Sequence, residues 1–393
     1  MDNFIKHFST TYEQIFQKVT VSDPVTNSRF ESKLTYGQTV TRFTLKDNVR
    51  IRDVQNDYDD REIDNLEDGE EMLTINKQKS ANFRISRKDR VQNGPLSAAA
   101  VQGGRVAKKM AICVDADVFS QVPEAYTTFD NGDLTGLGSN GTPIVLSDAN
   151  LYSVLTKLRA KLRRNNIGLE GTLFVMDSFA TAVVEANRLG KQIDSAETTF
   201  RNGFAGKVLS SGWYISENLT GEAVISASAN PANGDTVVIE GITFTIAAAP
   251  AAGSNEVLRG ASTQATLENI AAELNVPTNM DADDQIKLED ALQITATVVG
   301  TGAAATLVLK GIGSGRLNMG VTGTFAIDKN FIHAYFGKGS TIDLVMQDKL
   351  SMFETQEPRK PVKNYLTEYI YGYDTFEDSK QLFIDVHVDV SVA

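Results

Sequence analysis

The chain has 393 residues, of which 41% are hydrophobic and 22% are charged, which excludes a fibrous or a disordered protein and predicts two or three domains. The formal net charge of −12 would repel a phosphate backbone and excludes a general nucleic-acid binder. The only cysteine, Cys113, cannot form an intrachain disulfide, and we expect it to be buried and inert.

The N-terminal segment begins without the features of a signal peptide, and no run of about 18 uncharged apolar residues follows anywhere in the chain. We therefore expect a protein that stays in the cytoplasm where it is made and contacts no membrane. Residues 3–19 carry large apolar side chains at helical spacing, which predicts a short amphipathic arm. This arm packs either on its own domain or on a neighbouring copy. Its main apolar residues are Phe4, Ile5, Phe8, Tyr12, Ile15, Phe16 and Val19.

Residues 30–90 alternate in short β-like segments and contain a charge inversion. A basic segment, residues 77–90, follows an acidic one and includes Arg84, Arg87 and Arg90. Two interpretations stay open: a solvated hairpin, or an acidic tip that meets a basic patch on a neighbouring copy. The acidic segment contains Asp57, Asp59, Asp60, Glu62, Asp64, Glu67, Asp68, Glu70 and Glu71.

Three helices are expected in the next part of the chain. Proline at 95 and 123 bounds a long helix whose interior is small and apolar, with Gly103-Gly104 as a place where it can bend. Ser147 is expected to cap a second helix with an apolar stripe from Leu151 to Leu162 and a basic end. A strand over residues 173–176 leads into a third helix, and strands follow at 207–209 and 213–215. This pattern predicts an α+β core.

The composition changes between residues 219 and 327, where Ala, Gly, Thr and Val dominate and Tyr and Trp are absent. We interpret this segment as an inserted small α+β domain that is large enough to fold alone. Its pattern predicts a hairpin over 236–246, a helix over 262–274 and strands over 293–299 and 305–310. After this segment the sequence is again rich in aromatic residues. The chain ends in a predicted strand whose apolar residues occupy every second position from Leu382 to Val390.

No catalytic, cofactor-binding or metal-binding residue is predicted. The three histidines, His7, His333 and His387, lie far apart in the sequence without metal-ligand spacing, so we interpret them as structural or solvated. Residues 136–141 match GxGxxG, but no strand and helix flank them as the dinucleotide fingerprint requires. The acidic segment lacks the glycine of a calcium loop, and no nucleophile motif is present.

The order of these elements resembles that of tailed-bacteriophage major capsid proteins of the Hong Kong 97-type fold, particularly the Salmonella podovirus coat proteins that carry an inserted domain. The resemblance rests on residues 30–37, 84–117 and 173–190, and it extends over most of 1–218 and 328–393. It implies an N-terminal arm (1–29), an extended loop with flanking strands (30–94), a peripheral domain (95–168 and 350–393) with its spine helix at 95–122, an axial domain (169–218 and 328–349) and an insertion domain (219–327).

The resemblance also implies a function without catalysis or cofactors. The chain would assemble as pentamers and hexamers into an icosahedral shell around double-stranded DNA, in the cytoplasm of a bacterial host, and would end in the virion capsid. A scaffolding protein, a portal and decoration proteins are the expected partners. The intersubunit contacts would come from the arm residues Phe4, Phe8, Tyr12 and Phe16, the nine acidic residues at 57–71 and Arg84, Arg87 and Arg90. The alternatives are an encapsulin-like compartment shell and a phage tail or adhesin protein.

Overall fold

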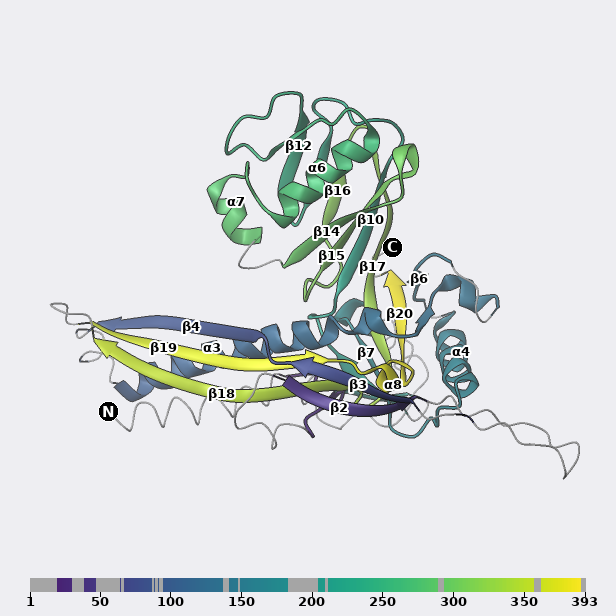
Figure 1. Cartoon of the computed structure of the whole chain (residues 1–393), viewed down its shortest axis with the longest axis vertical. Coiled ribbons are helices and arrows are strands. Elements are labelled where there is room, and N and C mark those ends of the chain that lie inside the picture. The colour runs from purple at the N-terminus through teal and green to yellow at the C-terminus, as the bar shows by residue number, and fades with distance from the viewer. Residues whose placement is uncertain are drawn as a thin grey trace, which may run out of the picture. The chain divides into compact units, whose positions relative to one another are not determined.

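The structure is a computed structural model that describes residues 20–29, 39–46, 64, 67–86, 88, 91, 95–136, 141–147, 149–182, 204–208, 211–288, 293–356 and 362–389. These residues form a mixed α+β fold, as the sequence predicts (Figure 1). The chain divides into two compact units. The first contains Met1–Thr26, Asn93–Thr341 and Glu377–Ala393, and the second contains Asn27–Gln92 and Ile342–Phe376.

A ten-stranded sheet runs through the described part of the first unit. Its main path has the order β14-β15-β10-β17-β7-β9-β8, and β20 joins it by pairing with β17 and with two short strands, β5 and β6. The strand bounds are β5 Thr127–Phe129, β6 Ile144–Val145, β7 Thr172–Met176, β8 Phe204–Val208, β9 Ser211–Ile215, β10 Gly221–Ala227, β14 Ile294–Val299, β15 Thr306–Gly311, β17 Phe325–Lys338 and β20 Phe383–Asp389.

The helices of the first unit follow the predicted apolar patterns. α3 spans Pro95–Phe119 and continues without a break through Gly103 and Gly104. α4 spans Leu151–Arg164 and buries its whole predicted stripe. Residues 178–182 are helical after Asp177, whose Oδ1 accepts a hydrogen bond from Ala180 N, and the rest of that predicted helix lies outside the described residues. The remaining helical segments are η2 Val122–Glu124, η3 Asn131–Leu134, α6 Thr263–Asn275, α7 Ala282–Lys287, η5 Gly302–Ala304 and α8 Glu377–Lys380.

Two local predictions in this unit are wrong. Ser147 does not cap α4: the N-cap is Asn150, and Ser147 instead accepts backbone hydrogen bonds from Asn150 and Leu151 through its carbonyl oxygen. Cys113 is half-buried rather than buried. It lies beside Ile112, which is exposed, because α3 turns these two positions toward the margin of its buried face while Val114 points inward.

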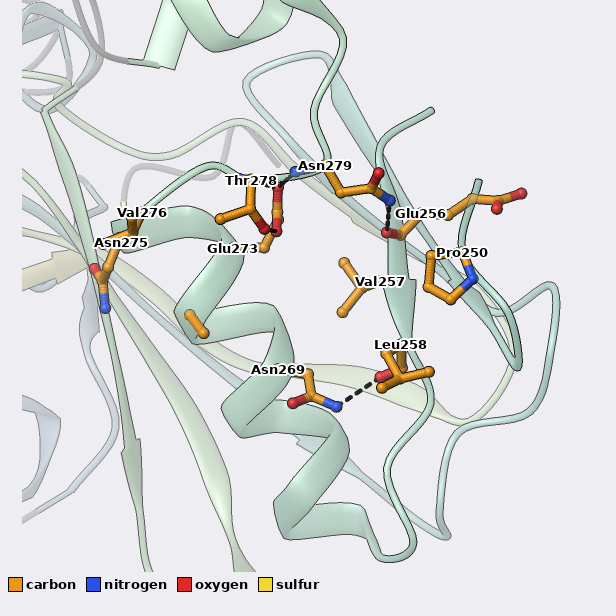
Figure 2. A pocket seen from close by; sticks show the side chains of 11 residues that line it. Pro250, Glu256, Val257, Leu258, Asn269, Glu273, Asn275, Val276, Thr278 and Asn279 are labelled. Atoms are coloured by element: carbon orange, nitrogen blue, oxygen red, sulfur yellow. Dashed lines mark hydrogen bonds between the residues drawn. The ribbon is translucent and has the colours of Figure 1, made fainter. Parts of the chain in front are cut away.

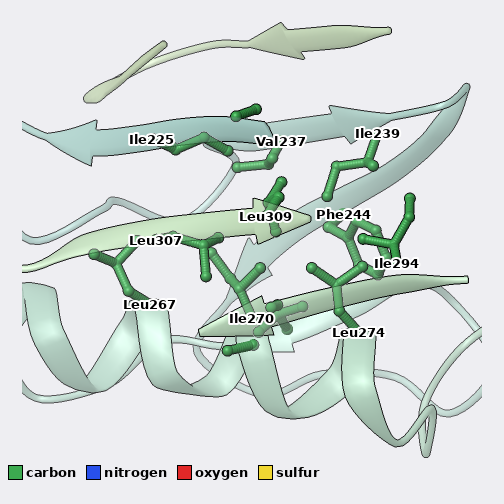
Figure 3. Close-up of a cluster of buried hydrophobic side chains, with 14 of the residues drawn as sticks. Ile225, Val237, Ile239, Phe244, Leu267, Ile270, Leu274, Ile294, Leu307 and Leu309 are labelled. Carbon is green, nitrogen blue, oxygen red and sulfur yellow. The ribbon is translucent and has the colours of Figure 1, made fainter. Parts of the chain in front are cut away.

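The segment that the sequence marks by its composition has a hydrophobic core of its own, built from residues between Ala223 and Phe325 (Figure 3). α6 contributes Leu267, Ile270 and Leu274, which recur at intervals of three and four residues and therefore lie on one face of the helix. These side chains pack against strands of the main sheet and of a second, four-stranded sheet. The second sheet has the order β13-β12-β11-β16, with bounds β11 Thr236–Ile239, β12 Ile242–Ala247, β13 Glu256–Leu258 and β16 Met319–Val321.

The predicted hairpin at 236–246 is present as the antiparallel pair β11–β12. Its two-residue loop consists of Glu240 and Gly241, with φ values of +51° and +81°. Positive φ at both loop positions is the signature of the type I′ turn that matches strand twist. The segment nevertheless shares hydrogen bonding with the rest of the unit, because β10 pairs with β17 from Gly221 opposite Ile332 to Ala227 opposite Phe325. The predicted boundaries at 219 and 327 stay a prediction.

The second unit contains two small sheets. One has the order β1-β18-β19-β4, and the other is the pair β2–β3. β18 is a single strand of 15 residues that crosses the domain boundary predicted between residues 349 and 350. Along β19, Tyr365, Tyr369 and Tyr371 are buried, as expected for alternate positions on one strand face. The bounds are β1 Thr26–Asn27, β2 Thr39–Lys46, β3 Glu67–Thr74, β4 Lys77–Ser86, β18 Ile342–Gln356 and β19 Val362–Asp374.

Candidate functional site

The β2–β3 pair has two different faces. On the inner face, Val40 stands opposite Leu73, which is buried in a small core with Ile75, Val345 and Phe376. On the outer face, defined here as Thr41, Phe43, Glu70 and Met72, the side chains of Phe43 and Met72 are 73% and 61% exposed. The register places them diagonally across the two strands. Because large exposed apolar side chains that adjoin one another mark interaction surfaces, the outer face is a candidate docking surface.

The predicted contact residues divide between described and undescribed parts of the chain. Among the described ones, Glu70 lies on the outer face, Glu71 on the inner face opposite Arg42, and Asp64 just before β3. Glu67 and Asp68 begin β3, and Arg84 is exposed on β4. The others lie outside the described residues: Phe4, Phe8, Tyr12, Phe16, Asp57, Asp59, Asp60, Glu62, Arg87 and Arg90.

The described parts of the acidic and basic segments pair with different strands and not with each other. Residues 57–63 lie outside the described residues, so both interpretations of the charge inversion stay predictions. Acidic residues 67–71 are part of β3 and pair with β2, whereas the basic segment forms β4 and pairs with β19 over ten residue positions from Val362 opposite Ser86 to Tyr371 opposite Lys77. Each strand pairs with a strand that is distant in sequence, and local charge patterning does not reveal such a pairing. Glu67–Glu71 is therefore strand and not tip.

Arg84 lies at a hollow in the second unit. The hollow has a volume of about 570 Å³, and β4, β18 and β19 supply its lining. Phe83 and Tyr365 stack in its wall with ring centroids 5.2 Å apart. Arg84 is an exposed residue of the lining, and a guanidinium can form two parallel hydrogen bonds with a carboxylate.

Two histidines predicted to be unrelated lie together in the first unit. The β17–β20 register places His333 opposite His387, and Asp385 lies two residues before His387 on the same face of β20. His333 Nδ1 is 2.8 Å from Asp385 Oδ2, and His387 Nε2 is 3.0 Å from the same oxygen. We define these three residues as the His–Asp–His cluster. Within the described residues, no other group of three His, Cys, Asp or Glu side chains brings its ligand atoms within 4.8 Å of one another.

The cluster is largely buried and electrostatically coupled. Asp385 and His333 are 1% and 3% exposed. Burial alone would raise the pKa of Asp385, but the charge of His333 and hydrogen bonds from both histidines lower it to about 2. Burial alone would lower the pKa of His333, but the Asp385 carboxylate, with Glu222 on the other side of the ring, raises it to about 9. The two opposite charges thus stabilise each other inside the sheet.

The sequence does not predict this cluster, because the spacing of the two histidines along the chain is not that of a metal-binding motif. His333 and His387 are more than fifty residues apart, and only the pairing of β17 with β20 makes them neighbours. The one local signal is the i, i+2 spacing of Asp385 and His387, which on a strand places both side chains on one face.

A groove of about 450 Å³ lies between α6 and β13 (Figure 2). Its polar groups already serve the fold: Glu273 accepts hydrogen bonds from the backbone N–H groups of Thr278 and Asn279, and Asn269 donates to the carbonyl oxygen of Leu258. Leu258 and Val276 are 49% and 67% exposed at its edge. The groove therefore offers apolar contacts to a partner, and its polar groups are already used in hydrogen bonds within the fold. No helix in the described part of the chain is long and apolar enough to cross a membrane.

No family model and no curated protein matches the chain. Several solved structures are similar to it. A structure from Mycobacterium phage Che8 shares 12% identity at a TM-score of 0.49, with 95% of this chain and 91% of that chain covered. The capsid of cyanophage P-SCSP1u shares 11% identity at a TM-score of 0.48 over 95% and 88% of the two chains. The capsid of Ralstonia phage GP4 shares 11% identity at a TM-score of 0.46 over 95% and 90%. All three are phage structures.

Proposed function

We propose that this chain is the major capsid protein of a tailed bacteriophage, and that many copies form the icosahedral head around double-stranded DNA. The observation that carries the proposal is the outer face of β2–β3. One face of this pair is buried in its own unit, while the other exposes Phe43 and Met72. A two-stranded sheet is marginally stable by itself, so a partner on the outer face would stabilise it.

A second copy of the chain is the partner that the charges favour. The outer face carries Glu70 beside its apolar pair, and β4 presents Arg84 at the hollow described above. A contact between two different surfaces of identical subunits is heterologous, and such contacts close into rings when the rotation permits. Pentamers and hexamers are rings of this kind. The acidic residues before β3 and the apolar arm at 1–29 would add contacts of the same type.

The order of elements supports the same conclusion. An extended two-stranded segment precedes a 25-residue helix, a mixed sheet follows, and two long antiparallel strands lie near the end of the chain. This is the order that the capsid resemblance predicts from the sequence. In this assignment, α3 is the spine helix of the peripheral domain, β7, β9 and β17 belong to the axial domain, and the segment with its own core is an insertion on the shell surface. A separate scaffolding protein and a portal would guide assembly in the host cytoplasm, and decoration proteins would bind the finished head.

Negative-stain electron microscopy of the expressed full chain, alone and with a scaffolding protein, tests the proposal. We expect closed spherical shells when the scaffolding protein is present. Rods or free trimers would indicate a tail or adhesin protein, and shells filled with enzyme cargo instead of nucleic acid would indicate an encapsulin-like compartment. Uniform closed shells from the chain alone would contradict the need for a scaffolding protein.

Point variants connect the outcome to the outer face. F43D with M72D places two charges on this face and should abolish shells while the subunit stays folded, as judged by circular dichroism. L258D with V276D is the matched control, because Leu258 and Val276 are also exposed apolar side chains but lie at the α6–β13 groove. Shells that form normally from the double variant would overturn the role of the outer face.

A further inference from the structure

We propose that the His–Asp–His cluster is a binding site for one divalent transition-metal ion, with Zn²⁺ as the reference ion. The ligands would be His333 Nδ1, Asp385 Oδ2 and His387 Nε2, and the ion would displace the proton that His333 holds toward Asp385, because an imidazole binds a metal only in its neutral form. The inference is independent of the proposed capsid function, because it concerns a site inside a single subunit.

The donor set selects the class of ion. Two imidazole nitrogens and one carboxylate oxygen suit Zn²⁺ and its first-row neighbours, whereas Ca²⁺ and Mg²⁺ prefer oxygen ligands alone. Three protein ligands leave a fourth position for water. A tetrahedral Zn²⁺ with bonds of about 2.0–2.1 Å separates its ligand atoms by about 3.3 Å. The nitrogens of His333 and His387 are 2.8 and 3.0 Å from Asp385 Oδ2, so small side-chain rotations admit the ion.

Unused hydrogen-bonding capacity distinguishes the cluster from a satisfied polar network. Both imidazoles point to Asp385 Oδ2, while Asp385 Oδ1 is buried without a hydrogen-bond partner. A buried carboxylate oxygen without a donor is costly. A metal ion removes this cost, because a carboxylate can bind it through either or both oxygens.

The surroundings hold the ligands in place as outer-shell groups do in metal sites. A metal-binding histidine usually donates its other ring N–H to a carboxylate, which fixes the tautomer. His333 Nε2 faces Glu222 Oε2 at 3.4 Å, and this nitrogen has no closer acceptor to bond. The Phe331 ring lies against both imidazoles, with centroids 5.1 Å from His333 and 4.5 Å from His387. Glu222 is therefore a positioning residue for the proposed site.

An entry path exists on one side. The side chains of His333 and Asp385 are 4% and 2% exposed, but those of His387 and Glu222 are 22% and 17% exposed. An ion can reach the cluster past His387. Once bound, it would link β20, the last described strand, to β17 in the middle of the main sheet and would resist separation of the two strands.

The test uses the full chain without a polyhistidine tag, stripped of metal with a chelator and titrated with ZnCl₂ by calorimetry. We expect one ion per chain and a higher thermal unfolding midpoint with Zn²⁺ than with chelator. H387A should lower the affinity at least about 100-fold, and E222Q about tenfold, since loss of an outer-shell partner typically costs 10- to 100-fold. H387N provides a second variant with a polar side chain if H387A fails to fold.

Two controls exclude other ligands. H7A removes the histidine outside the cluster, and C113S removes the only thiol, so both should bind Zn²⁺ like the wild type. Absence of binding to the wild type, or equal binding by H387A or H387N, would show that the cluster is a hydrogen-bonded network only. An unfolding midpoint that is the same with Zn²⁺ and with chelator would overturn the proposed link between β17 and β20.

Discussion

Ser22 Oγ donates a hydrogen bond of 2.6 Å to Asp115 Oδ1, which attaches the chain before β1 to the C-terminal half of α3. The backbone N–H groups of Val21 and Ser22 donate to the same carboxylate at 2.9 and 3.1 Å. Ser22 and Asp115 are fully buried. Three donors on one buried carboxylate make Asp115 the anchor of this segment.

Removal of the anchor should destabilise the first unit. D115A leaves two buried backbone N–H groups without an acceptor, and we expect it to lower the unfolding free energy by about 2–4 kcal/mol. S22A removes one bond and keeps the other two, so about 1 kcal/mol is expected. Denaturant unfolding followed by Trp213 fluorescence measures both. Equal losses in the two variants would mean that the backbone bonds contribute nothing.

The same carboxylate should produce an unusual pH dependence. Burial raises the pKa of Asp115 to about 6 from 3.8, and burial likewise raises the pKa values of Asp177 and Asp343 to about 6. A group with a raised pKa binds its proton more tightly in the folded state. Its stabilising contribution is complete below the unfolded value near 4 and is lost as the pH rises through 6. The unassembled chain should therefore be more stable at pH 5 than at pH 7.

The contribution of Asp115 to this pH dependence can be isolated. Its raised pKa corresponds to about 1.3 kcal/mol of unfolding free energy between pH 5 and pH 7, and the full value of about 3 kcal/mol is reached only below pH 4. D115N has no titrating group at this position, so its unfolding free energy should change less between pH 5 and 7 than that of the wild type. S22A retains the carboxylate and should keep the dependence. A D115N profile parallel to that of the wild type would refute the assignment.

The segment of residues 219–332, which contains a hydrophobic core of its own, should fold by itself. A fragment of residues 219–332 keeps the whole core cluster and the β10–β17 pairing. It ends at the part of β17 that pairs with β20 and β7. We expect a single cooperative unfolding transition in calorimetry. F244A removes a fully buried ring from this core and should cost about 3–5 kcal/mol. A fragment without a cooperative transition would show that the shared sheet, and not the separate core, stabilises the segment.

Gly337 should tolerate no side chain. It stands opposite Phe383 in the β17–β20 register, and a Cβ added to it would lie 2.3 Å from Phe383 Cβ and 2.8 Å from the Leu382 carbonyl oxygen. G337A should thus push β20 away from β17 and lower the thermal midpoint strongly. G168A is the control, since the nearest atom to its new Cβ is Lys338 Nζ at 3.8 Å. Similar midpoints for the two variants would contradict the close strand approach.

The sequence predicts those features of the fold that depend on residues close together in the chain. The stripe from Leu151 to Leu162 and the Glu240-Gly241 turn depend on local periodicity and turn chemistry, and both are present as predicted in kind. Strand pairing depends on contacts between distant segments. Spacing along the chain does not predict that β3 pairs with β2 or that His333 lies opposite His387. Each of these contacts depends on which strands pair and in which register. The contact surfaces proposed for assembly could be predicted from the sequence only in part. The sequence shows that Glu70 and Arg84 are charged, but only the folded strands show that both are exposed.

Glu70 and Arg84 should form a pair between subunits. Each is exposed within its own subunit, and opposite charges across an interface fix register and exclude wrong contacts. E70R or R84E alone places like charges together and should reduce the yield of closed shells in negative-stain images. The double variant E70R/R84E restores opposite charges in reversed order and should recover shells. E268R, at an exposed position of α6 in the first unit, is a charge-matched control on neither surface. If the double variant assembles no better than either single variant, the two residues contact different partners.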